Sequence, residues 1–302
     1  MYPDTATNAP EISTVADRRT MLFGFVLTLA IVEIALPLVL VLLRDRFIFL
    51  PAARPGPEEG LALLSGRAEV ELVRVPRPDG RRLAAYDARP LGGGDPAAPV
   101  VLYLHGNAGN IAYRAPLLED FVAGTGLRTL LLDYSGYGGN PGTPSETTAY
   151  DDALAAFDWL VADGVEPRRI VPYGESLGAA VALAVGERRP CGGVVAQSAF
   201  ASLSAMAREA YPWLPLAALF TRGAYPSDRR ARALEVPLLI VHGTRDRIIP
   251  FTQAEKLHAA ARPGTELLAI AGAGHNDLLE VAGEPYLQSL ARRLEGWVRA
   301  GS

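Results

Sequence analysis

The longest apolar run of the chain extends from Met21 to Leu43, and Glu33 is its only charged residue. As a helix, its 23 residues span roughly 35 Å, more than the ~30 Å hydrocarbon core of a bilayer. The leucine, isoleucine, valine and phenylalanine residues of the run outweigh the cost of one central acid. The pattern therefore predicts a transmembrane helix at 21–43, preceded by a polar, flexible tail at 1–20.

Two other kinds of helix share this composition. A cleaved signal peptide is disfavoured because its apolar core is usually shorter than this run. A buried core helix is disfavoured because the run is apolar on every side. Basic residues flank both ends, with Arg18 and Arg19 before the run and Arg44 and Arg46 after it. We therefore expect a single-pass membrane protein whose orientation these charges leave open.

Beyond this anchor, prolines and glycines at 44–66 predict a linker or a docking segment. The stretches Ala68–Val75 and Arg82–Arg89 alternate apolar and polar residues around a Pro-Asp-Gly turn, which predicts an antiparallel hairpin. Short apolar strands then alternate with helices, so we expect one α/β domain at 67–302 with a mostly parallel sheet. The predicted strands are Val100–Leu104, Thr129–Asp133, Ile170–Tyr173, Gly193–Gln197, Pro237–His242 and Glu266–Ile270.

The strand at Ile170–Tyr173 leads into Gly174-Glu175-Ser176-Leu177-Gly178 and then into a helix-compatible run of small residues. A strand, a sharp turn that carries a serine, and a helix together form a nucleophile elbow. Glycine suits both ends of such a turn because a side chain there collides with the neighbouring backbone. We therefore expect Ser176 to be a nucleophile, although the same motif also occurs in ordinary glycine-bounded turns.

Two later strand ends supply the partners that such a serine needs. Asp246 follows the strand at 237–242, and His275 follows the strand at 266–270. Ser176, Asp246 and His275 thus occur in the chain order nucleophile, acid, histidine. A serine hydroxyl becomes reactive when a neutral imidazole accepts its proton and a carboxylate orients that imidazole. Asp277 is the alternative acid, but we expect it to cap the last helix.

A loop after the first parallel strand, His105-Gly106-Asn107-Ala108-Gly109-Asn110, is placed to stabilise negative charge. We expect an oxyanion hole formed by the backbone N–H groups of Asn107 and Leu177. His105 is expected to orient the loop rather than to catalyse. The loop lacks the Lys-Ser/Thr ending of a phosphate loop, which argues against nucleotide binding.

Composition excludes several other classes of function. A net charge of −4 provides no electrostatic footprint for nucleic acid. Cys191 is the only cysteine, so an internal disulfide is excluded. The four histidines have no ligand-like spacing, and we expect neither a metal nor a cofactor.

Several motifs together carry a resemblance to a known family. Asp133-Tyr134-Ser135-Gly136-Tyr137-Gly138, the loop at 105–110, the elbow at 174–178 and the stretch Pro237–Pro250 resemble the α/β-hydrolase-domain proteins of the Bem46 type. The similarity is greatest to the subgroup called α/β-hydrolase domain-containing protein 13, and it covers roughly residues 40–295.

Members of that family are membrane-anchored serine hydrolases with an α/β-hydrolase fold. The resemblance implies Ser176, Asp246 and His275 as the catalytic triad, and Asn107 with Leu177 at the oxyanion hole. Ser135 stands where an arginine is frequent in the family. The family's relatives include lipid and thioester hydrolases, so the resemblance leaves the substrate open.

The longest interruption of the strand–helix alternation is at 199–232. In this fold, an insertion there overhangs the serine, so we expect a short helical cap. Its apolar, aromatic stretch is expected to hold an acyl chain or to touch a bilayer through Tyr211, Trp213, Leu216 and Phe220. The alternative is a cap whose apolar face packs on the domain.

These observations predict a membrane-anchored serine hydrolase that cleaves an ester or thioester of an apolar acyl group. Its substrate is expected to be a small or lipid-like molecule, or an acylated protein. A peptidase or amidase on the same fold is one alternative, since fold does not decide function. A catalytically silent membrane scaffold is another, against which the complete set of serine, acid and histidine argues.

Overall fold

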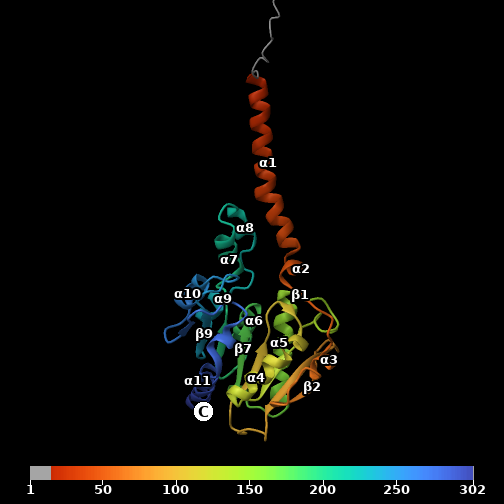
Figure 1. Ribbon diagram of the computed structural model, residues 1–302. Helices are drawn as coiled ribbons and strands as arrows, with labels where there is room; N and C mark the ends of the chain where they lie inside the picture. The colour runs from red at the N-terminus through yellow and green to blue at the C-terminus, as the bar shows by residue number, and fades with distance from the viewer. Residues whose placement is uncertain (1–14, 302) are drawn as a thin grey trace, which may run out of the picture.

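The computed structural model describes residues 15–301. Of the predicted tail at 1–20, residues 1–14 lie outside this part of the chain, and the rest belongs to the first helix, α1 (Val15–Leu42). The helix begins before the apolar run because no glycine or proline at 15–20 interrupts it. α1 projects away from the rest of the molecule, and the C-terminus lies at the opposite end (Figure 1).

The strands form one eight-stranded sheet in the order β10-β9-β8-β7-β4-β6-β3-β2. The pairs β2–β3 and β3–β6 are antiparallel, whereas all other neighbours in the sheet are parallel. The predicted mostly parallel sheet with an N-terminal antiparallel hairpin is therefore confirmed. The strands are β2 (Ala68–Pro76), β3 (Arg82–Pro90), β4 (Val100–Leu104), β6 (Thr129–Leu132), β7 (Ile170–Glu175), β8 (Val194–Gln197), β9 (Leu238–Gly243) and β10 (Glu266–Ile270).

Helices cover both faces of this sheet, and each face has its own apolar core. One core packs the sheet against α5 and α6, with α9 and α10 beside them, and the other packs it against α4 and α11. The parallel crossovers place these helices because each strand returns to the sheet through a right-handed connection. The helices are α4 (Ala115–Thr125), α5 (Glu146–Ala162), α6 (Leu177–Arg188), α9 (Ser227–Ala233), α10 (Phe251–Ala260) and α11 (Leu278–Gly301), with 3₁₀ turns η1 (Ile111–Arg114) and η2 (Pro167–Arg169).

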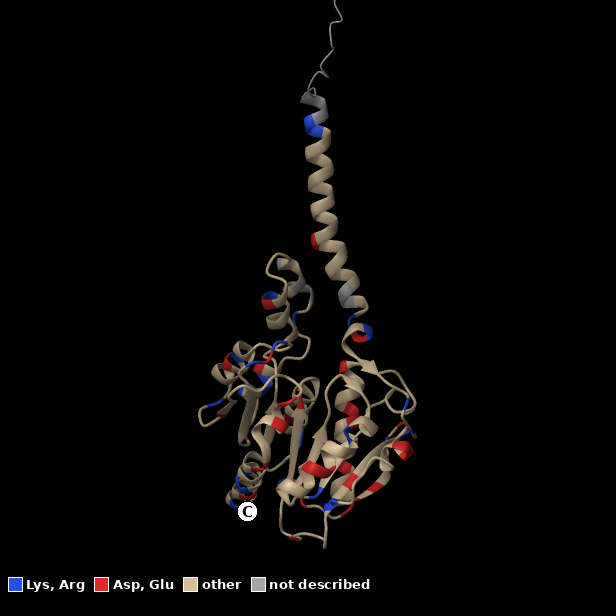
Figure 2. Cartoon of the chain, viewed as in Figure 1, with Lys and Arg blue, Asp and Glu red and all other residues tan. Residues whose placement is uncertain are grey.

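Within the described residues, α1 is the one helix that is long and apolar enough to cross a membrane, over Arg18–Val39. Figure 2 shows that its charged residues are confined to its N-terminal end and to one acid further along. A signal sequence near an N-terminus meets the same criterion of length and composition. The apolar N-terminal helix is thus observed, and its role is taken up below.

The segment after α1 docks on the domain instead of acting as a free linker. We call residues 44–57 the docking segment; it contains α2 (Arg44–Ile48) and β1 (Leu50–Pro51), and it leads into α3 (Pro57–Leu61). β1 pairs in parallel with the short strand β5 (Ala108–Gly109). Phe49 is 3% exposed and meets the ring of Tyr137 edge-on. Backbone pairing and burial therefore hold this segment against the loop that follows β4.

The insertion at 199–232 contains two short helices, α7 (Leu203–Ala210) and α8 (Pro215–Phe220), and all of α9 except its last residue. The side chain of Ser202 caps α7 by accepting the N–H of Ala205. α7 and α8 stand above the C-terminal edge of the parallel strands, and α8 packs along α1 (Figure 1). Residues 199–224, which we call the cap, therefore reach from the C-terminal edge of the parallel strands to α1.

Candidate active site

Ser176 stands at a sharp turn between β7 and α6, as the glycine pattern predicts. Its backbone has φ 56° and ψ −115°, a left-handed conformation that is rare for a residue with a side chain. The turn is tight: a Cβ atom on Gly174 would lie 2.0 Å from the carbonyl oxygen of Gly178, and one on Gly178 would lie 1.9 Å from that of Leu104. The Ser176 N–H donates to the Gln197 carbonyl at 2.8 Å and holds the strained residue in place.

His275 lies between Ser176 and Asp246, although all three come from different loops. Its Nε2 atom is 3.1 Å from Ser176 Oγ, and its Nδ1 atom is 2.7 Å from Asp246 Oδ2. The carboxylate accepts the Nδ1 proton, which leaves Nε2 free to accept the proton of the serine hydroxyl. The structure therefore brings together the three side chains that were predicted from their order in the sequence.

Asp246 is held as an anion by a dense set of donors. Its Oδ1 atom accepts the backbone N–H groups of Ile248 and Ile249, each at 2.8 Å. Its Oδ2 atom lies 2.7 Å from His275 and 3.2 Å from His242 Nε2. Burial by itself raises the pKa of a carboxyl, but the hydrogen bonds from His242, His275 and the Ile249 amide outweigh it and hold the pKa of Asp246 well below its usual range.

His242, which sequence reasoning did not assign to the site, is thus a second histidine on this carboxylate. Its Nε2 atom also lies 2.8 Å from the carbonyl oxygen of Ile249, so both of its neighbours are acceptors and Nε2 carries the proton. His242 ends β9 four residues before Asp246, and that spacing is the one signal in the sequence for it.

Asp277, the alternative acid, has a different partner. Its Oδ1 atom accepts the N–H of Gly274 at 2.6 Å, immediately before His275. It also occupies the position just before α11, whose Val281 N–H bonds to the Asp277 carbonyl at 2.8 Å. Asp277 therefore shapes the loop that carries His275, while Asp246 holds the imidazole.

The two residues predicted for the oxyanion hole border the same cavity as Ser176 and His275. Leu177 is the first residue of α6, a position whose N–H has no acceptor within the helix. The side-chain amide of Asn107 donates to the Ile48 carbonyl at 2.8 Å, so that amide is engaged with the docking segment. The backbone N–H of Asn107 is therefore the candidate donor to an oxyanion formed next to Ser176.

The Asn107 loop is held by the docking segment. The carbonyl oxygen of Asn107 accepts the Leu50 N–H at 2.9 Å and the Tyr137 hydroxyl at 2.6 Å. The Asn110 side chain donates to the carbonyls of Ala52 at 2.9 Å and Pro55 at 2.7 Å. The chain that follows α1 thus holds the loop that borders the cavity over Ser176.

A cavity of about 600 Å³ opens over Ser176, and most of its side chains are apolar. They come from α2, from the cap and from the turn after β9. Sequence reasoning missed nearly all of them, because their apolar character does not show which side of a short helix they occupy. The large apolar side chains that these three segments contribute include Phe47, Ile48, Phe200, Leu203, Met206, Tyr211, Ile248 and Ile249.

Of the predicted substrate-binding residues, Tyr211 lines this cavity. Trp213 and Leu216 do not line it, and the side chain of Phe220 lies outside the described residues. Trp213 is 62% exposed and packs edge-on against Tyr211. The cap therefore presents Leu203, Met206 and Tyr211 to the serine and turns Trp213 toward the exterior.

His105 and Asp133 form a buried pair beneath the Asn107 loop. His105 Nδ1 lies 2.7 Å from the Gly106 carbonyl, and Nε2 lies 3.1 Å from Asp133 Oδ1. Burial raises the pKa of Asp133. Neither side chain borders the cavity over Ser176, which agrees with the expectation that His105 orients the loop.

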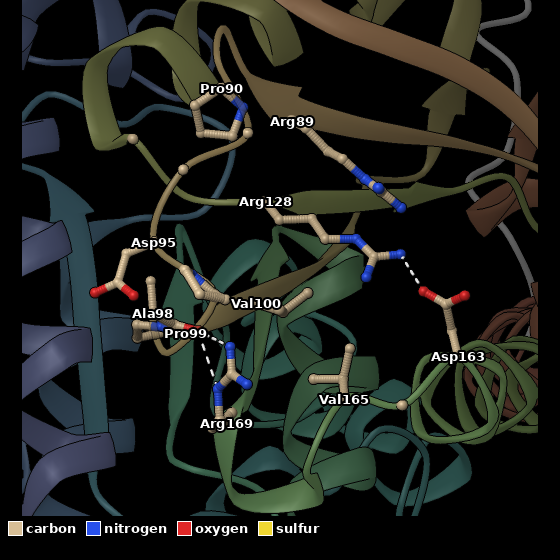
Figure 3. Close-up of a pocket in the computed structure, with 15 residues that line it drawn as sticks. Arg89, Pro90, Asp95, Ala98, Pro99, Val100, Arg128, Asp163, Val165 and Arg169 are labelled. Atoms are coloured by element: carbon tan, nitrogen blue, oxygen red, sulfur yellow. Dashed lines mark hydrogen bonds and ion pairs between the residues drawn. The ribbon is translucent and has the colours of Figure 1, made fainter.

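A second cavity, of about 280 Å³, lies at the opposite edge of the sheet (Figure 3). Its arginines are engaged in contacts within the fold. Arg128 pairs with Asp87 and Asp163, and Arg169 donates to the Ala98 carbonyl, as the dashed lines of Figure 3 show in part. Within residues 15–301, no group of three or more histidine, cysteine or acidic side chains is arranged to hold a metal ion.

A mostly parallel eight-stranded sheet with a serine on a strained strand–helix turn defines the α/β hydrolase class. Residues 99–234 match the sequence model of the alpha/beta hydrolase fold. The chain is 40% identical over 252 residues to the uncharacterized protein Rv2307c of Mycobacterium tuberculosis, covering 83% of this chain and 87% of that protein. It is 30% identical over 213 residues to the uncharacterized protein YfhR of Escherichia coli, with 68% and 74% covered. The chain belongs to the α/β hydrolase family.

Solved structures show the same fold at low sequence identity. An esterase of Pyrococcus furiosus aligns with a TM-score of 0.64 and 21% identity, over 83% of this chain and 98% of that one. Carboxyl esterase 2 of Tuber melanosporum aligns with a TM-score of 0.58 and 19% identity, over 78% and 89%. These neighbours are esterases by name. The finer resemblance to Bem46-type proteins stays a prediction.

Proposed function

We propose that this protein is a membrane-anchored serine hydrolase that cleaves carboxylic esters or thioesters of apolar acyl groups. One observation carries the proposal: an unbroken chain of hydrogen bonds runs from Asp246 through His275 to Ser176, at the floor of an apolar cavity. The backbone of Ser176 is also strained, with a φ of 56°, and backbone strain of this kind is often found at functional sites.

In the proposed reaction, Ser176 Oγ attacks the acyl carbon while its proton passes to His275 Nε2. The resulting oxyanion is stabilised by the N–H groups of Asn107 and Leu177, aided by the N-terminus of α6. Collapse breaks the bond to the leaving alcohol or thiol, which takes the proton from His275. Water then attacks the acyl-enzyme by the same route, releasing the carboxylic acid and restoring the Ser176 hydroxyl.

The lining of the cavity favours an apolar acyl group over a peptide. The acidic residue in the lining of the cavity is Glu175. Its carboxylate accepts the Tyr103 hydroxyl at 3.2 Å and lies 3.9 Å from Arg114, so it already has partners within the protein. A peptidase that holds a free amino terminus needs an acid left for that purpose. The side chains contributed by α2 and the cap instead suit an alkyl chain.

A fluorophosphonate probe tests the proposed nucleophile in the full-length protein in detergent. Ser176→Ala should abolish covalent labelling and hydrolysis of p-nitrophenyl esters. Ser198→Ala is the matched control, since Ser198 also ends a strand with a positive φ, 49°, but does not border the cavity. The proposal fails if Ser176→Ala retains the wild-type rate. Faster cleavage of p-nitroanilides than of the matching esters favours an amidase.

The role of α1 as an anchor needs a test of its own. After expression in cells, the full-length chain should stay with the membrane fraction through alkaline carbonate extraction. Sequencing of the mature N-terminus separates the two roles of such a helix. A chain that begins after residue 43 identifies a cleaved signal sequence, and a chain that retains α1 supports the anchor.

A further inference from the structure

The cap contacts α1 within the apolar stretch of this helix. Pro37 is buried and Glu33 is half-buried, one turn apart on the same face, whereas the other described side chains at 18–39 are exposed. Since α8 packs along α1, the contact lies near these two residues. In the view of Figure 2, the tip of the cap (residues 211–219) stands level with the C-terminal part of α1.

This contact places the cap tip within the span of the proposed anchor. Glu33 and Pro37 precede Leu42, the last residue of α1, by nine and five residues. At about 1.5 Å per residue, that is roughly 8 to 14 Å along the helix axis. If the apolar end of α1 marks the edge of the hydrocarbon region, α8 lies inside that region and not in water.

The composition of the cap tip suits that position. Residues 210–221 contain no charged side chain, between Glu209 and Arg222. Tyr211, Trp213 and Leu219 are 51%, 62% and 57% exposed, an unusual arrangement for large side chains of a water-facing loop. Tyrosine and tryptophan are the residues that gather where hydrocarbon meets the headgroups.

The base of the cap is polar and basic, in contrast to the tip. Arg208 and Arg222 of the cap border a groove together with Asp228 and Arg229 of the neighbouring α9. Arginines at this level fit the phosphates of lipid headgroups. Glu209 accepts from Lys256 and from Gln253, each at 2.6 Å, so the base is tied to α10. The cap thus changes from charged to apolar in the direction in which α1 leaves the domain.

The catalytic cavity lies between the same two elements. Phe47 from α2 and Tyr211 from the cap both border it. Phe47 is 60% exposed and lies in α2, five residues after the last residue of α1. The opening toward Ser176 therefore lies between the cap and the segment that follows the apolar helix.

We propose that the cap tip, residues 211–219, is embedded in the leaflet that surrounds the C-terminal end of α1, and that the acyl substrate reaches Ser176 from this leaflet. The substrate class is then the ester of a bilayer-resident lipid, whose acyl chain enters between α2 and the cap. The proposal rests on the proposed function, because α1 must remain as an anchor.

Depth-dependent quenching tests the position of the cap in phosphatidylcholine vesicles that contain nitroxide-labelled lipids. A fluorophore is attached to Leu219→Cys in the full-length protein, with Ile31→Cys on α1 and Leu91→Cys at a distant turn as references. Burial raises the pKa of the native Cys191 thiol to about 11, so it reacts slowly and gives little background.

The label at 219 should be quenched as strongly as the label at 31, and the label at 91 should not be quenched. Quenching at 31 without quenching at 219 overturns the inference and leaves the anchor intact. Absence of quenching at both positions overturns the anchor, and with it the inference.

An activity test addresses the route of the substrate. Leu219→Asp places a charge on the cap tip at a residue that does not border the cavity over Ser176, and Leu91→Asp is the matched control at an equally exposed leucine. Leu219→Asp should lower hydrolysis of a fluorogenic long-chain ester dissolved in vesicles at least tenfold, because a charge is excluded from hydrocarbon. Hydrolysis of a soluble acetyl ester should change less than twofold.

Either of two results overturns the proposed route. One is an unchanged rate on the vesicle-bound ester, and the other is an equal loss on both esters. Failure of the unmodified protein to cleave either ester counts against the proposed function itself.

Discussion

Phe49 provides the sharpest test of how the docking segment supports catalysis. Its ring is 3% exposed and meets Tyr137, whose hydroxyl donates to the Asn107 carbonyl. Replacing a buried phenylalanine by alanine typically costs about 3–5 kcal/mol in the free energy of unfolding. For a domain of this size, at about 2–4 °C per kcal/mol, Phe49→Ala should lower the melting temperature by roughly 6–20 °C.

The same change should also slow the reaction. Without the ring of Phe49, Tyr137 loses its packing partner and the Asn107 loop is less firmly held. Loss of one oxyanion donor lowers kcat by about 10²–10³, which sets the upper limit for a displaced N–H. We expect kcat for a short ester to fall by about tenfold to a hundredfold, with little change in KM, because the defect appears mainly in the transition state.

Leu50→Ala is the matched control, one residue away. Leu50 is 52% exposed and does not border the cavity over Ser176, so its loss should change the free energy of unfolding by less than about 0.5 kcal/mol. Thermal melting and the rate of fluorophosphonate labelling measure both effects at a temperature where each variant is folded. A Phe49→Ala protein that melts early but reacts at the wild-type rate refutes the link between the docking segment and the oxyanion loop.

Three further predictions concern the acid, its protonation and the cavity. Asp246→Asn should lower kcat by about 10⁴, as in a well-studied triad, whereas Asp277→Asn should retain most activity; the reverse order in steady-state assays assigns the acid to Asp277. The pKa of Asp246 is lower in the folded state than in the unfolded chain, so its carboxylate stabilises the fold above a pH of about 4 and loses that effect as the pH falls further. The denaturant midpoints of the wild type and of Asp246→Asn should therefore converge as the pH is lowered. Met206→Ala should slow long-chain esters more than short ones, by up to about fourfold per methylene that loses burial; equal losses at every chain length point to damaged packing.

The fold and the sharp turn that carries Ser176 could be predicted from the sequence because their signals are local. Alternation of short apolar strands with helices requires a parallel sheet, whatever the details of packing. The elbow depends on contacts between residues four apart, Gly174 and Gly178, so its steric demand is visible in the chain itself. The order of Ser176, Asp246 and His275 further narrowed the choice of catalytic residues.

Chain order favours Asp246 over Asp277 as the partner of His275, and the tertiary structure shows that contact. Asp277 is closer in sequence to His275, yet Asp246 reaches its Nδ1 atom because β9 and β10 are adjacent parallel strands that end at one edge of the sheet. The contact of His242 with Asp246 could not be predicted from the sequence, for a related reason. Its distance from Asp246 depends on the curvature of the turn after β9, which four residues of sequence do not specify.

The lining of the cavity was also beyond the reach of sequence. The docking segment has prolines and no clear periodicity, so its parallel pairing with β5 has no local signal. In the cap, Trp213 and Met206 are both apolar, but only Met206 borders the cavity. An apolar side chain is stabilised about equally by contact with the protein core, with an acyl chain or with a bilayer. Which of these surroundings it meets depends on the direction in which its short helix packs, and the sequence does not specify that direction.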